Sequence, residues 1–372
     1  MLVLTRYGRL SPTTRVRFLQ FIENLERDDG SSLRFDIAPL LEDHCLQQFY
    51  DDGTRNSVYL LKRYLKRARL LLACKRYDLV WIEKELFPAL PALAERILRA
   101  RGVTTIVDYD DAAYAWYHHH PSWLIRTVLG RKIEVVCRAS DTVVAGNPTL
   151  AAFASAAGAR DVVVVPSAIN IEKYSQAMEH RPSPNRSEFV VGWIGTPSNV
   201  RYLDIFKDAL TDMASTTDFK FLTIGAPGHL FDSVAQEAHP WSEGTEAGLL
   251  ARCDCTVAPL SDGDFERGKC GFKVIQGMAA GLPVVASPVG VVRDIIQHGK
   301  NGFLAETASD CRQVLQQLRH DPDLRLRVGR AARRTVTSLY SDGAVNCLLR
   351  DVFRDALGNA AAPTSKLAHS TD

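Results

Sequence analysis

The chain has 372 residues, which is more than one compact core usually supports, so two domains are expected. Hydrophobic residues make up 46% and charged residues 24%, a composition typical of a soluble globular protein. The 45 basic and 43 acidic side chains leave a formal net charge of only +2, which argues against a dedicated nucleic-acid-binding protein.

The first half of the chain alternates short apolar runs with amphipathic helical patterns. The expected strands span residues 1–5, 79–82, 105–107, 142–145 and 162–165. The expected helices include residues 15–27, 89–101 and 149–157. Strands and helices that take turns are the signature of a parallel sheet covered on both faces. A first Rossmann-like domain is therefore predicted over residues 1–175.

A polar segment with two prolines, residues 177–187, predicts a linker, after which the α/β pattern restarts. Strands are expected at 189–194, 220–224 and 256–258, with a helix at 202–213. The second domain is predicted over 188–338, a last helix over about 339–357 packs back on the first domain, and 358–372 form a disordered tail. The predicted fold class is α/β, with two doubly wound domains facing a central cleft where ligands bind.

The most informative segment is KCGFKVIQGMAAGLPVVASPVG, residues 269–290. It predicts a basic loop, a short helix, a glycine-proline break and a strand. Free backbone N–H groups and the helix dipole attract a phosphate to a helix N-terminus, and Lys269 and Lys273 add full charges there. The alternative is a solvated helix start with ordinary lysines.

A second motif, VGWIGTPSNVRYL at residues 191–203, predicts a strand that ends at a tight turn before a helix. Gly195 would let the backbone come close to a ligand, and Thr196 offers a hydroxyl. Arg201 is expected in or near the first helical turn, where it could meet an anion. The alternative is a plain strand-to-helix turn.

Both motifs resemble the C-terminal half of GT-B glycosyltransferases of the retaining family-4-like group. The resemblance extends over residues 188–341 through NGFLA and GRAARRTVTSLYS, and is weaker in the first half through YDLVWIEKELFP, IVDYDDA and TVVAGNPTLAAFA. It implies a GT-B fold and retaining transfer of a sugar from a nucleotide diphosphate sugar to a glycan or lipid-linked acceptor. It also implies a role in cell-surface polysaccharide or glycolipid synthesis, without a metal or other cofactor.

The resemblance assigns a role to several residues of the two motifs. Arg201 aligns with a family lysine that binds the donor diphosphate, while Thr196 replaces a family arginine. Lys269 and Lys273 lie where they could supply the missing charge, and we expect Lys273 and Arg201 to act in catalysis. Gly8 matches the family's glycine-bearing loop near the donor phosphates and the acceptor.

The family usually has two glutamates eight residues apart before this helix. Gln276 aligns with the one that binds the ribose hydroxyls, and Gly268 aligns with the one that contacts the donor sugar. Glutamine still offers an oxygen acceptor, but glycine has no side chain, so we expect Glu266 or Asp264 to compensate. This departure leaves an alternative open: an inactive sugar-nucleotide-binding partner, or a scaffold of a glycan-assembly complex.

Aspartates follow the expected strand 105–107, in the sequence DYDD at 108–111. Carboxylates at this end of a strand face the cleft, and many relatives have a histidine here that hydrogen-bonds the sugar, so Asp110 is a candidate catalytic residue. DYDD could instead be a metal site of a GT-A enzyme or the start of a haloacid-dehalogenase-type phosphatase, but neither accounts for 188–341. The histidines at 118–120 are expected in a loop and not at a metal.

The segment 60–76 carries seven basic and no acidic residues between leucines, which predicts a basic amphipathic helix. We expect it to touch an anionic membrane surface, although an ordinary helix with solvated lysines fits the same pattern. No apolar run is long enough to span a membrane, and residues 1–5 are too short for a signal peptide. The expected location is therefore the cytoplasm, with peripheral contact to the inner face of the membrane if this helix binds lipid.

Overall fold

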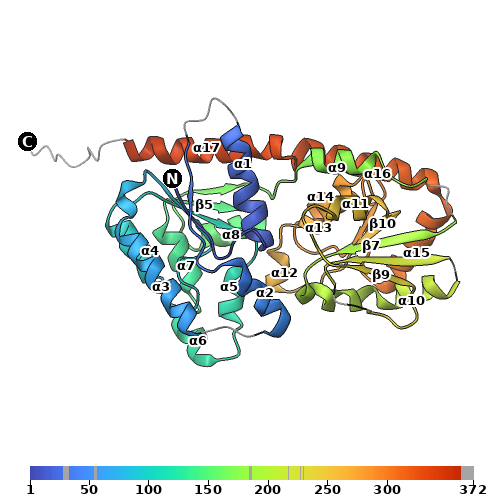
Figure 1. The fold of residues 1–372 in the computed structure, drawn as a ribbon, viewed down its shortest axis with the longest axis horizontal. Coiled ribbons are helices and arrows are strands. Elements are labelled where there is room, and N and C mark those ends of the chain that lie inside the picture. The colour runs from blue at the N-terminus through green and yellow to red at the C-terminus, as the bar shows by residue number, and fades with distance from the viewer. Residues whose placement is uncertain are drawn as a thin grey trace, which may run out of the picture.

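The computed structural model shows two α/β domains side by side (Figure 1), each built on a six-stranded parallel sheet. It describes residues 1–27, 33–53, 57–183, 187–216, 218–226, 228 and 230–361. Two doubly wound sheets in one chain confirm the predicted fold class. Within the described part of the chain, no helix combines the length and apolarity needed to cross a membrane.

The first sheet has the strand order β2-β1-β3-β4-β5-β6. Its strands are β1 (Leu2–Leu4), β2 (Asp36–Ile37), β3 (Val80–Glu83), β4 (Thr105–Tyr109), β5 (Thr142–Ala145) and β6 (Val162–Val164). Five of them match the expected strands. The sequence pattern missed β2, because two exposed residues carry no apolar periodicity.

The helices of the first domain cover both faces of this sheet. They are η1 (Thr14–Leu19), α1 (Gln20–Arg27), α2 (Asp43–Asp52), α3 (Ser57–Leu72), η2 (Cys74–Arg76), α4 (Leu93–Ala100), α5 (Ala113–His118), α6 (Trp123–Leu129), α7 (Lys132–Ala139) and α8 (Pro148–Ala156). The next helix, α9 (Ile171–Met178), packs on the second domain instead. Alternate residues of a strand face opposite sides. Trp81 of β3 accordingly packs with α1, whereas its neighbours Val80 and Ile82 pack with α4, α7 and α8.

The second sheet has the order β12-β11-β10-β7-β8-β9. Its strands are β7 (Phe189–Ile194), β8 (Phe219–Ile224), β9 (Gln236–His239), β10 (Cys255–Ala258), β11 (Val284–Ala286) and β12 (Phe303–Leu304). Its helices are η3 (Pro197–Phe206), α10 (Lys207–Thr216), α11 (Glu246–Ala251), α12 (Asp264–Arg267), α13 (Phe272–Ala279), α14 (Val292–Ile295), α15 (Ala308–His320) and α16 (Pro322–Leu339).

The expected helix at 202–213 is split into the 3-10 helix η3 and the α-helix α10. Side chains three residues apart eclipse one another in a 3-10 helix, so Leu203 and Phe206 both reach the core. The split matters for the site, because it changes the direction in which the polar residues of η3 point.

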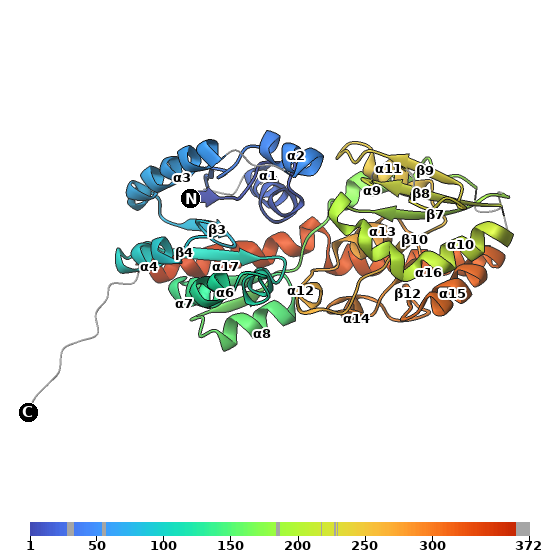
Figure 2. The same ribbon diagram turned by 90° about the horizontal axis from the view of Figure 1, so that it is seen from below.

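The last helix, α17 (Asp342–Ala361), returns from the second domain and lies along the first (Figures 1 and 2). Phe353 is buried against Trp81, with ring centroids 5.1 Å apart. The helix runs beyond 357, so residues 358–361 are helical and not part of a disordered tail. Residues 362–372, and 184–186 of the expected linker, lie outside the described residues, whereas 177 and 178 belong to α9.

Candidate active site

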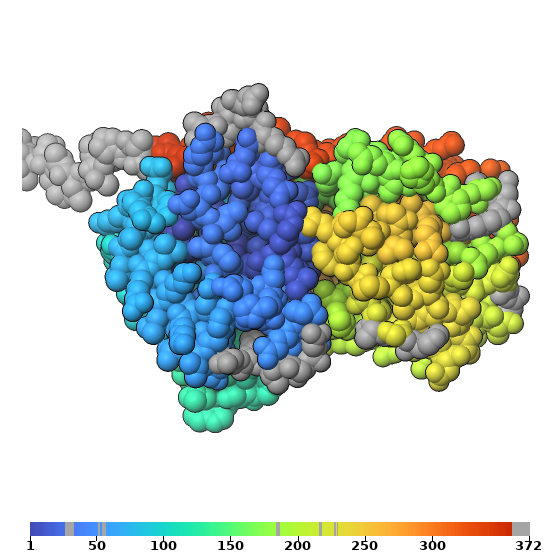
Figure 3. Space-filling model, viewed as in Figure 1, coloured from blue at the N-terminus to red at the C-terminus, as the bar shows by residue number. Residues whose placement is uncertain are grey.

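A cavity of about 810 Å³ lies between the two domains, which touch along much of their boundary in the space-filling view (Figure 3). The first domain contributes residues that follow β1, β3 and β4. The second contributes residues that follow β7, β8 and β10, and the first turn of α13. The carboxyl ends of both sheets therefore meet at one cavity, which is the usual ligand site of doubly wound folds.

Lys273 lies in the first turn of α13 and lines the cavity. Its Nζ is 4.8 Å from the ring centroid of Trp193. A Cβ atom on Gly195 would come within 2.8 Å of this Nζ, so the absence of a side chain at position 195 leaves room for the amino group of Lys273. Burial, and then the charge of Lys269, lower the pKa of Lys273 to about 7. No ion pair of Lys273 with a carboxylate occurs among the described residues.

Lys269 lines the same cavity, and its Nζ is 4.7 Å from the ring centroid of Phe265. Burial lowers the pKa of Lys269, although the carboxylates of Asp111 and Asp110 oppose this shift. The two lysines predicted from the sequence thus lie together at one side of the cavity, in the second domain.

The turn after β7 forms the adjoining surface, and Gly195 and Thr196 both line the cavity. Gly225 has φ +82°, and a side chain there would collide with the carbonyl oxygen of Gly195. The hydroxyl of Thr196 lies 3.0 Å from Ser198 Oγ and accepts a hydrogen bond of 2.6 Å from Asn199 Nδ2. The close approach of the two glycine loops keeps backbone atoms at the cavity surface.

Gln276 is buried and lines the cavity from α13. Its Nε2 donates to the hydroxyl of Tyr174 at 3.3 Å and to Glu246 Oε2 at 3.1 Å. Glu246 also accepts from Trp241 Nε1 and from Lys173 Nζ, both at 2.7 Å. These bonds fix the orientation of the Gln276 amide. No local pattern indicated Glu246, because it lies 30 residues away from Gln276.

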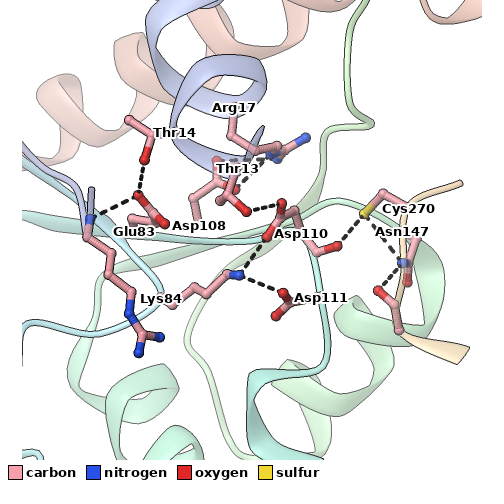
Figure 4. A network of polar contacts seen from close by, with 12 residues as sticks. Thr13, Thr14, Arg17, Glu83, Lys84, Asp108, Asp110, Asp111, Asn147 and Cys270 are labelled. Atoms are coloured by element: carbon pink, nitrogen blue, oxygen red, sulfur yellow. Dashed lines mark hydrogen bonds and ion pairs between the residues drawn. The ribbon is translucent and has the colours of Figure 1, made fainter. Parts of the chain in front are cut away.

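Asp110 follows β4 and lines the cavity. Figure 4 shows Thr13 and Lys84 directed at its carboxylate and Lys84 also at Asp111. Thr13 Oγ1 donates to Asp110 Oδ2 at 2.7 Å, and Lys84 Nζ lies 3.0 Å from Asp110 Oδ1 and 2.6 Å from Asp111 Oδ2. Burial alone would raise the pKa of Asp110, but Lys84, the Thr13 hydroxyl and Arg17 outweigh it and lower the pKa.

Lys84 is a site residue that the sequence patterns did not single out. Its backbone has φ +59°, a left-handed conformation that is costly for a residue with a side chain. The conformation turns the chain right after β3 and lets the side chain reach the end of the neighbouring strand β4. The only available signal was its place at the carboxyl end of a buried strand.

An ion pair beneath the cavity holds η1 against β4. Arg17 and Asp108 are both buried, with Nε and Oδ1 2.9 Å apart, and Arg17 also donates to the carbonyl of Val165 at 2.7 Å. Burial raises the pKa of Asp108 to about 6, against the opposing charge of Arg17. Arg17 sits in a π-helical turn, a feature often found at functional sites.

Arg201 does not line the cavity, although the sequence predicted that it binds the diphosphate there. Its side chain is 67% exposed, donates to the hydroxyl of Tyr202 at 2.9 Å and lies 3.6 Å from Glu266. The 3-10 geometry of η3 explains this, because Tyr202 and Leu203 turn inward and leave Arg201 outside. Gly8 does not line the cavity either; a side chain there would come within 2.7 Å of Asp43 Oδ1.

Gly268 lies at the contact between the domains. A side chain there would come within 2.5 Å of Ala112 Cβ. Its carbonyl accepts from Asn147 Nδ2 at 2.8 Å, and the next residue but one, Cys270, donates to the carbonyl of Asp110 at 3.1 Å. Glycine at this position is therefore required by the close approach of the two domains.

Neither residue expected to replace the missing glutamate lines the cavity. Glu266 accepts a hydrogen bond of 2.6 Å from the hydroxyl of Tyr202, and Asp264 lies 3.0 Å from His119 Nε2. The expected compensation by these two carboxylates is thus not seen. The described residues contain no group of three or more histidine, cysteine or acidic side chains arranged to hold a metal ion.

The basic segment 60–76 forms α3 and the short helix η2, but its cations do not all face solvent. Arg67 is buried and donates to the carbonyls of Thr5 and Ala38, each at 2.8 Å. Arg63 donates to the carbonyl of Leu40 at 2.8 Å. These two arginines hold the first domain together and are not available to a partner surface.

Residues 188–321 match the family model described as glycosyl transferases group 1. A curated relative, the N-acetyl-alpha-D-glucosaminyl L-malate synthase of Bacillus anthracis, is 24% identical over 181 residues, which is 46% of this chain and 47% of the relative. The D-inositol 3-phosphate glycosyltransferase of Thermomonospora curvata is 34% identical over 98 residues, 26% of this chain and 22% of that protein. The chain thus spans about half the length, or less, of these relatives.

Solved structures share the architecture of about 95% of the chain. Anabaena HepE, crystallised with UDP and glucose, is 16% identical with a TM-score of 0.69, over 95% of this chain and 98% of that one. WaaG, a glycosyltransferase involved in lipopolysaccharide biosynthesis, is 13% identical with a TM-score of 0.65, over 95% and 99%. The second domain is therefore a glycosyltransferase group 1 domain, and the chain as a whole has the GT-B fold.

Proposed function

We propose that the protein transfers a sugar from a nucleotide diphosphate sugar to an acceptor hydroxyl in the cavity between its domains. The observation that carries the proposal is the convergence of Lys269, Lys273 and the N-terminus of α13 at the carboxyl edge of the second sheet. The family domain covers this part of the cavity, and HepE structures with UDP and with UDP-glucose support a donor of this class.

The leaving diphosphate gains negative charge as the bond to the sugar breaks. Lys273 and Lys269 are positioned before the reaction begins, and a fixed positive charge in a partly dry cavity stabilises such a transition state well. The first turn of α13 adds backbone N–H groups. Because these groups supply the positive charge, the proposed reaction requires no metal ion.

Asp110 is the acidic group best placed to act on the sugar. Its lowered pKa keeps it a carboxylate, which suits a hydrogen bond to a sugar hydroxyl or stabilisation of positive charge near the anomeric carbon. Lys84 and Thr13 hold this carboxylate from the other side. Retention of the anomeric configuration is part of the proposal, and NMR of the first-formed product tests it.

In this proposal Gln276 binds the ribose hydroxyls of the donor, in place of the family's glutamate. Its Nε2 is engaged by Tyr174 and Glu246, so its Oε1 is the atom that would accept a hydrogen bond from a ribose hydroxyl. Thr196 and the glycine loops at 195 and 225 would lie along the nucleotide, where backbone atoms are exposed to the cavity. Gln276→Ala should then weaken the binding of UDP more than that of pyrophosphate.

The proposed acceptor is a glycan or lipid-linked molecule at an anionic membrane surface, in cell-surface polysaccharide or glycolipid synthesis. One exposed side of α3 carries Leu61, Leu65 and Leu72, whose exposed fractions are 62%, 51% and 72%. Lys62 and Lys66 lie exposed beside them. Such a face suits the headgroup region of the cytoplasmic leaflet.

Vesicle cosedimentation tests this surface. The double variant Lys62→Glu/Lys66→Glu should lose most binding to phosphatidylglycerol vesicles, since each basic residue contributes about 1 kcal/mol at such a surface. Phosphatidylcholine vesicles are the control and should bind both proteins weakly. Equal binding of wild type and variant to phosphatidylglycerol would remove α3 from the proposal.

A second candidate function is a non-catalytic partner that binds a sugar nucleotide, and Gly268 is the observation that favours it. The domains meet too closely there for the sugar-contacting glutamate of the resembled family. Hydrolysis of the donor in the absence of acceptor distinguishes the two functions. A catalytic protein should release UDP from UDP-glucose slowly and lose this activity in Lys273→Met, whereas a binding partner should release none.

The first experiment is a thermal-shift screen across nucleotide sugars, because a ligand of the folded state raises its melting temperature. We expect stabilisation by at least one nucleotide diphosphate sugar and its loss in Lys273→Met. Lys207→Met, a lysine at the exposed start of α10, is the matched control and should respond like wild type. A screen without any stabilising nucleotide sugar would contradict the proposal.

A further inference from the structure

Arg6 is a cation of the cavity to which the proposed transfer assigns no task. It follows β1 in the first domain and lines the cavity. Its backbone is fixed on both sides: its N–H donates to Glu83 Oε2 at 3.0 Å, and its carbonyl accepts from the N–H of Leu41 at 2.9 Å. Its side-chain Nε is buried, yet no hydrogen-bond partner for this atom occurs among the described residues.

The other buried or half-buried arginines of this edge are fully engaged. Arg17 binds Asp108 and the carbonyl of Val165, and Arg67 binds two carbonyls. Arg15 donates to the carbonyl of Arg9 at 3.0 Å and lies 4.0 Å from the centroid of the Trp241 ring. A buried donor without a partner is costly, so such groups usually serve a ligand.

The acidic groups near Arg6 are already occupied. Glu83 accepts from the Arg6 backbone and from Thr14 Oγ1 at 2.9 Å. Glu85 forms an ion pair with Lys132 and accepts from the hydroxyl of Tyr117 at 2.7 Å. Within the residues that the structure describes, no carboxylate lies in ion-pair distance of the Arg6 guanidinium.

We propose that the guanidinium of Arg6 binds a carboxylate or phosphate group of the acceptor. This inference rests on the proposed transfer, and it assigns the acceptor to the anionic class. The position favours the acceptor over the donor: Arg6 comes from the first domain, whereas Lys269 and Lys273 lie in the second. A guanidinium presents parallel N–H donors that match both anions in a two-point contact.

The test uses the full chain saturated with UDP, so that the second-domain cations are occupied, and inorganic phosphate and succinate as separate probes. Wild type should bind at least one of them, and Arg6→Gln should bind it at least tenfold more weakly. Arg6→Lys keeps the charge and should lie between them. Arg354→Gln, on the exposed side of α17, is the matched control and should bind like wild type.

Three outcomes overturn the inference: neither anion binds to the UDP-saturated wild type, Arg6→Gln binds as well as wild type, or Arg6→Gln weakens UDP itself tenfold. The last would place Arg6 at the donor diphosphate. Failure of UDP to bind wild type at all is a different result, because it contradicts the proposed function before any anion is added. A folded Arg6→Gln is verified by its circular dichroism and melting temperature.

The chemical class is then tested by transfer from UDP-glucose, or from the donor found in the screen, to glycerol 3-phosphate and to glycerol. Wild type should use the phosphate-bearing acceptor with the higher kcat/KM. In Arg6→Gln the ratio of the two kcat/KM values should fall at least tenfold, mainly through KM of the charged acceptor. An unchanged ratio would mean that Arg6 does not select for the anionic group.

Discussion

The lowered pKa of Lys273 should make binding of the proposed donor depend on pH. Burial and the charge of Lys269 bring this pKa to about 7, so the free protein holds Lys273 largely neutral above pH 7. A bound diphosphate favours the ammonium form and raises the pKa again. Binding therefore takes up a proton, and affinity falls as the pH rises above 7. If the pKa returns to its ordinary value in the complex, the loss of affinity between pH 7.5 and 9 reaches about 20-fold.

The contact between Lys273 and UDP contributes to the affinity separately from its pH dependence. Hydrogen bonds to charged groups contribute about 1.5–3 kcal/mol, so Lys273→Met should weaken UDP binding by roughly 10- to 150-fold at pH 7. This variant should also lose the pH dependence that Lys273 causes. Lys273→Arg keeps its charge over the whole range, so its affinity for UDP should change little between pH 7 and 9.

Calorimetric titration of UDP at pH 7.5, 8.0, 8.5 and 9.0 measures this effect, in a range where the phosphates of UDP are fully ionised. Repeating each titration in two buffers with different ionisation enthalpies counts the protons taken up. A wild-type affinity that stays constant while Lys273→Met binds weakly would refute the pKa argument but keep the contact. Unchanged binding by Lys273→Met would remove Lys273 from the donor site.

Three further outcomes follow from the same structure. Asp110→Asn removes the charge beside Lys84 and keeps the shape, so kcat of sugar transfer should fall about a hundredfold while the melting temperature changes little; an unchanged kcat would exclude a catalytic role. Gly268→Glu should lower the free energy of unfolding, measured in urea, by about 1–3 kcal/mol, because the new side chain collides with Ala112. An unchanged free energy would show that the domains separate easily there. Phe353→Ala should lower the free energy of unfolding by about 3–5 kcal/mol, since this ring is buried against Trp81. A loss below 1 kcal/mol in the same urea unfolding would mean that α17 contributes little to the stability of the first domain.

Local patterns in the sequence were enough to predict most strands of the two sheets, but not β2, β9 and β12, which are short or partly exposed. Apolar runs such as Val190 and Val191 alternate with helices because a parallel strand is covered on both faces. The same local reasoning placed Lys269 and Lys273 at a helix start, since capping and charge act within a few residues. That these lysines lie close to Gly195 could be predicted only from the family resemblance, because the two motifs are far apart in the sequence.

The direction of individual side chains was less accessible from the sequence. The family resemblance implied that Arg201 binds the donor diphosphate, and the pattern placed it in or near the first turn of a helix expected at 202–213. The intervening 3-10 helix rotates the side chains differently, and only packing of Leu203 and Phe206 in the core selects it. Helix type over one or two turns depends on tertiary contacts more than on propensity.

The sequence by itself determined where most of the buried strands and the amphipathic helices lie, because burial imposes its period on neighbouring residues. The tertiary structure alone decided which distant residues form the site. Lys84 reaches Asp110 because β3 and β4 are adjacent strands, and Gly268 touches Ala112 because the edges of two separate sheets meet there. Such contacts are set by how whole domains dock, and no short stretch of sequence encodes that geometry.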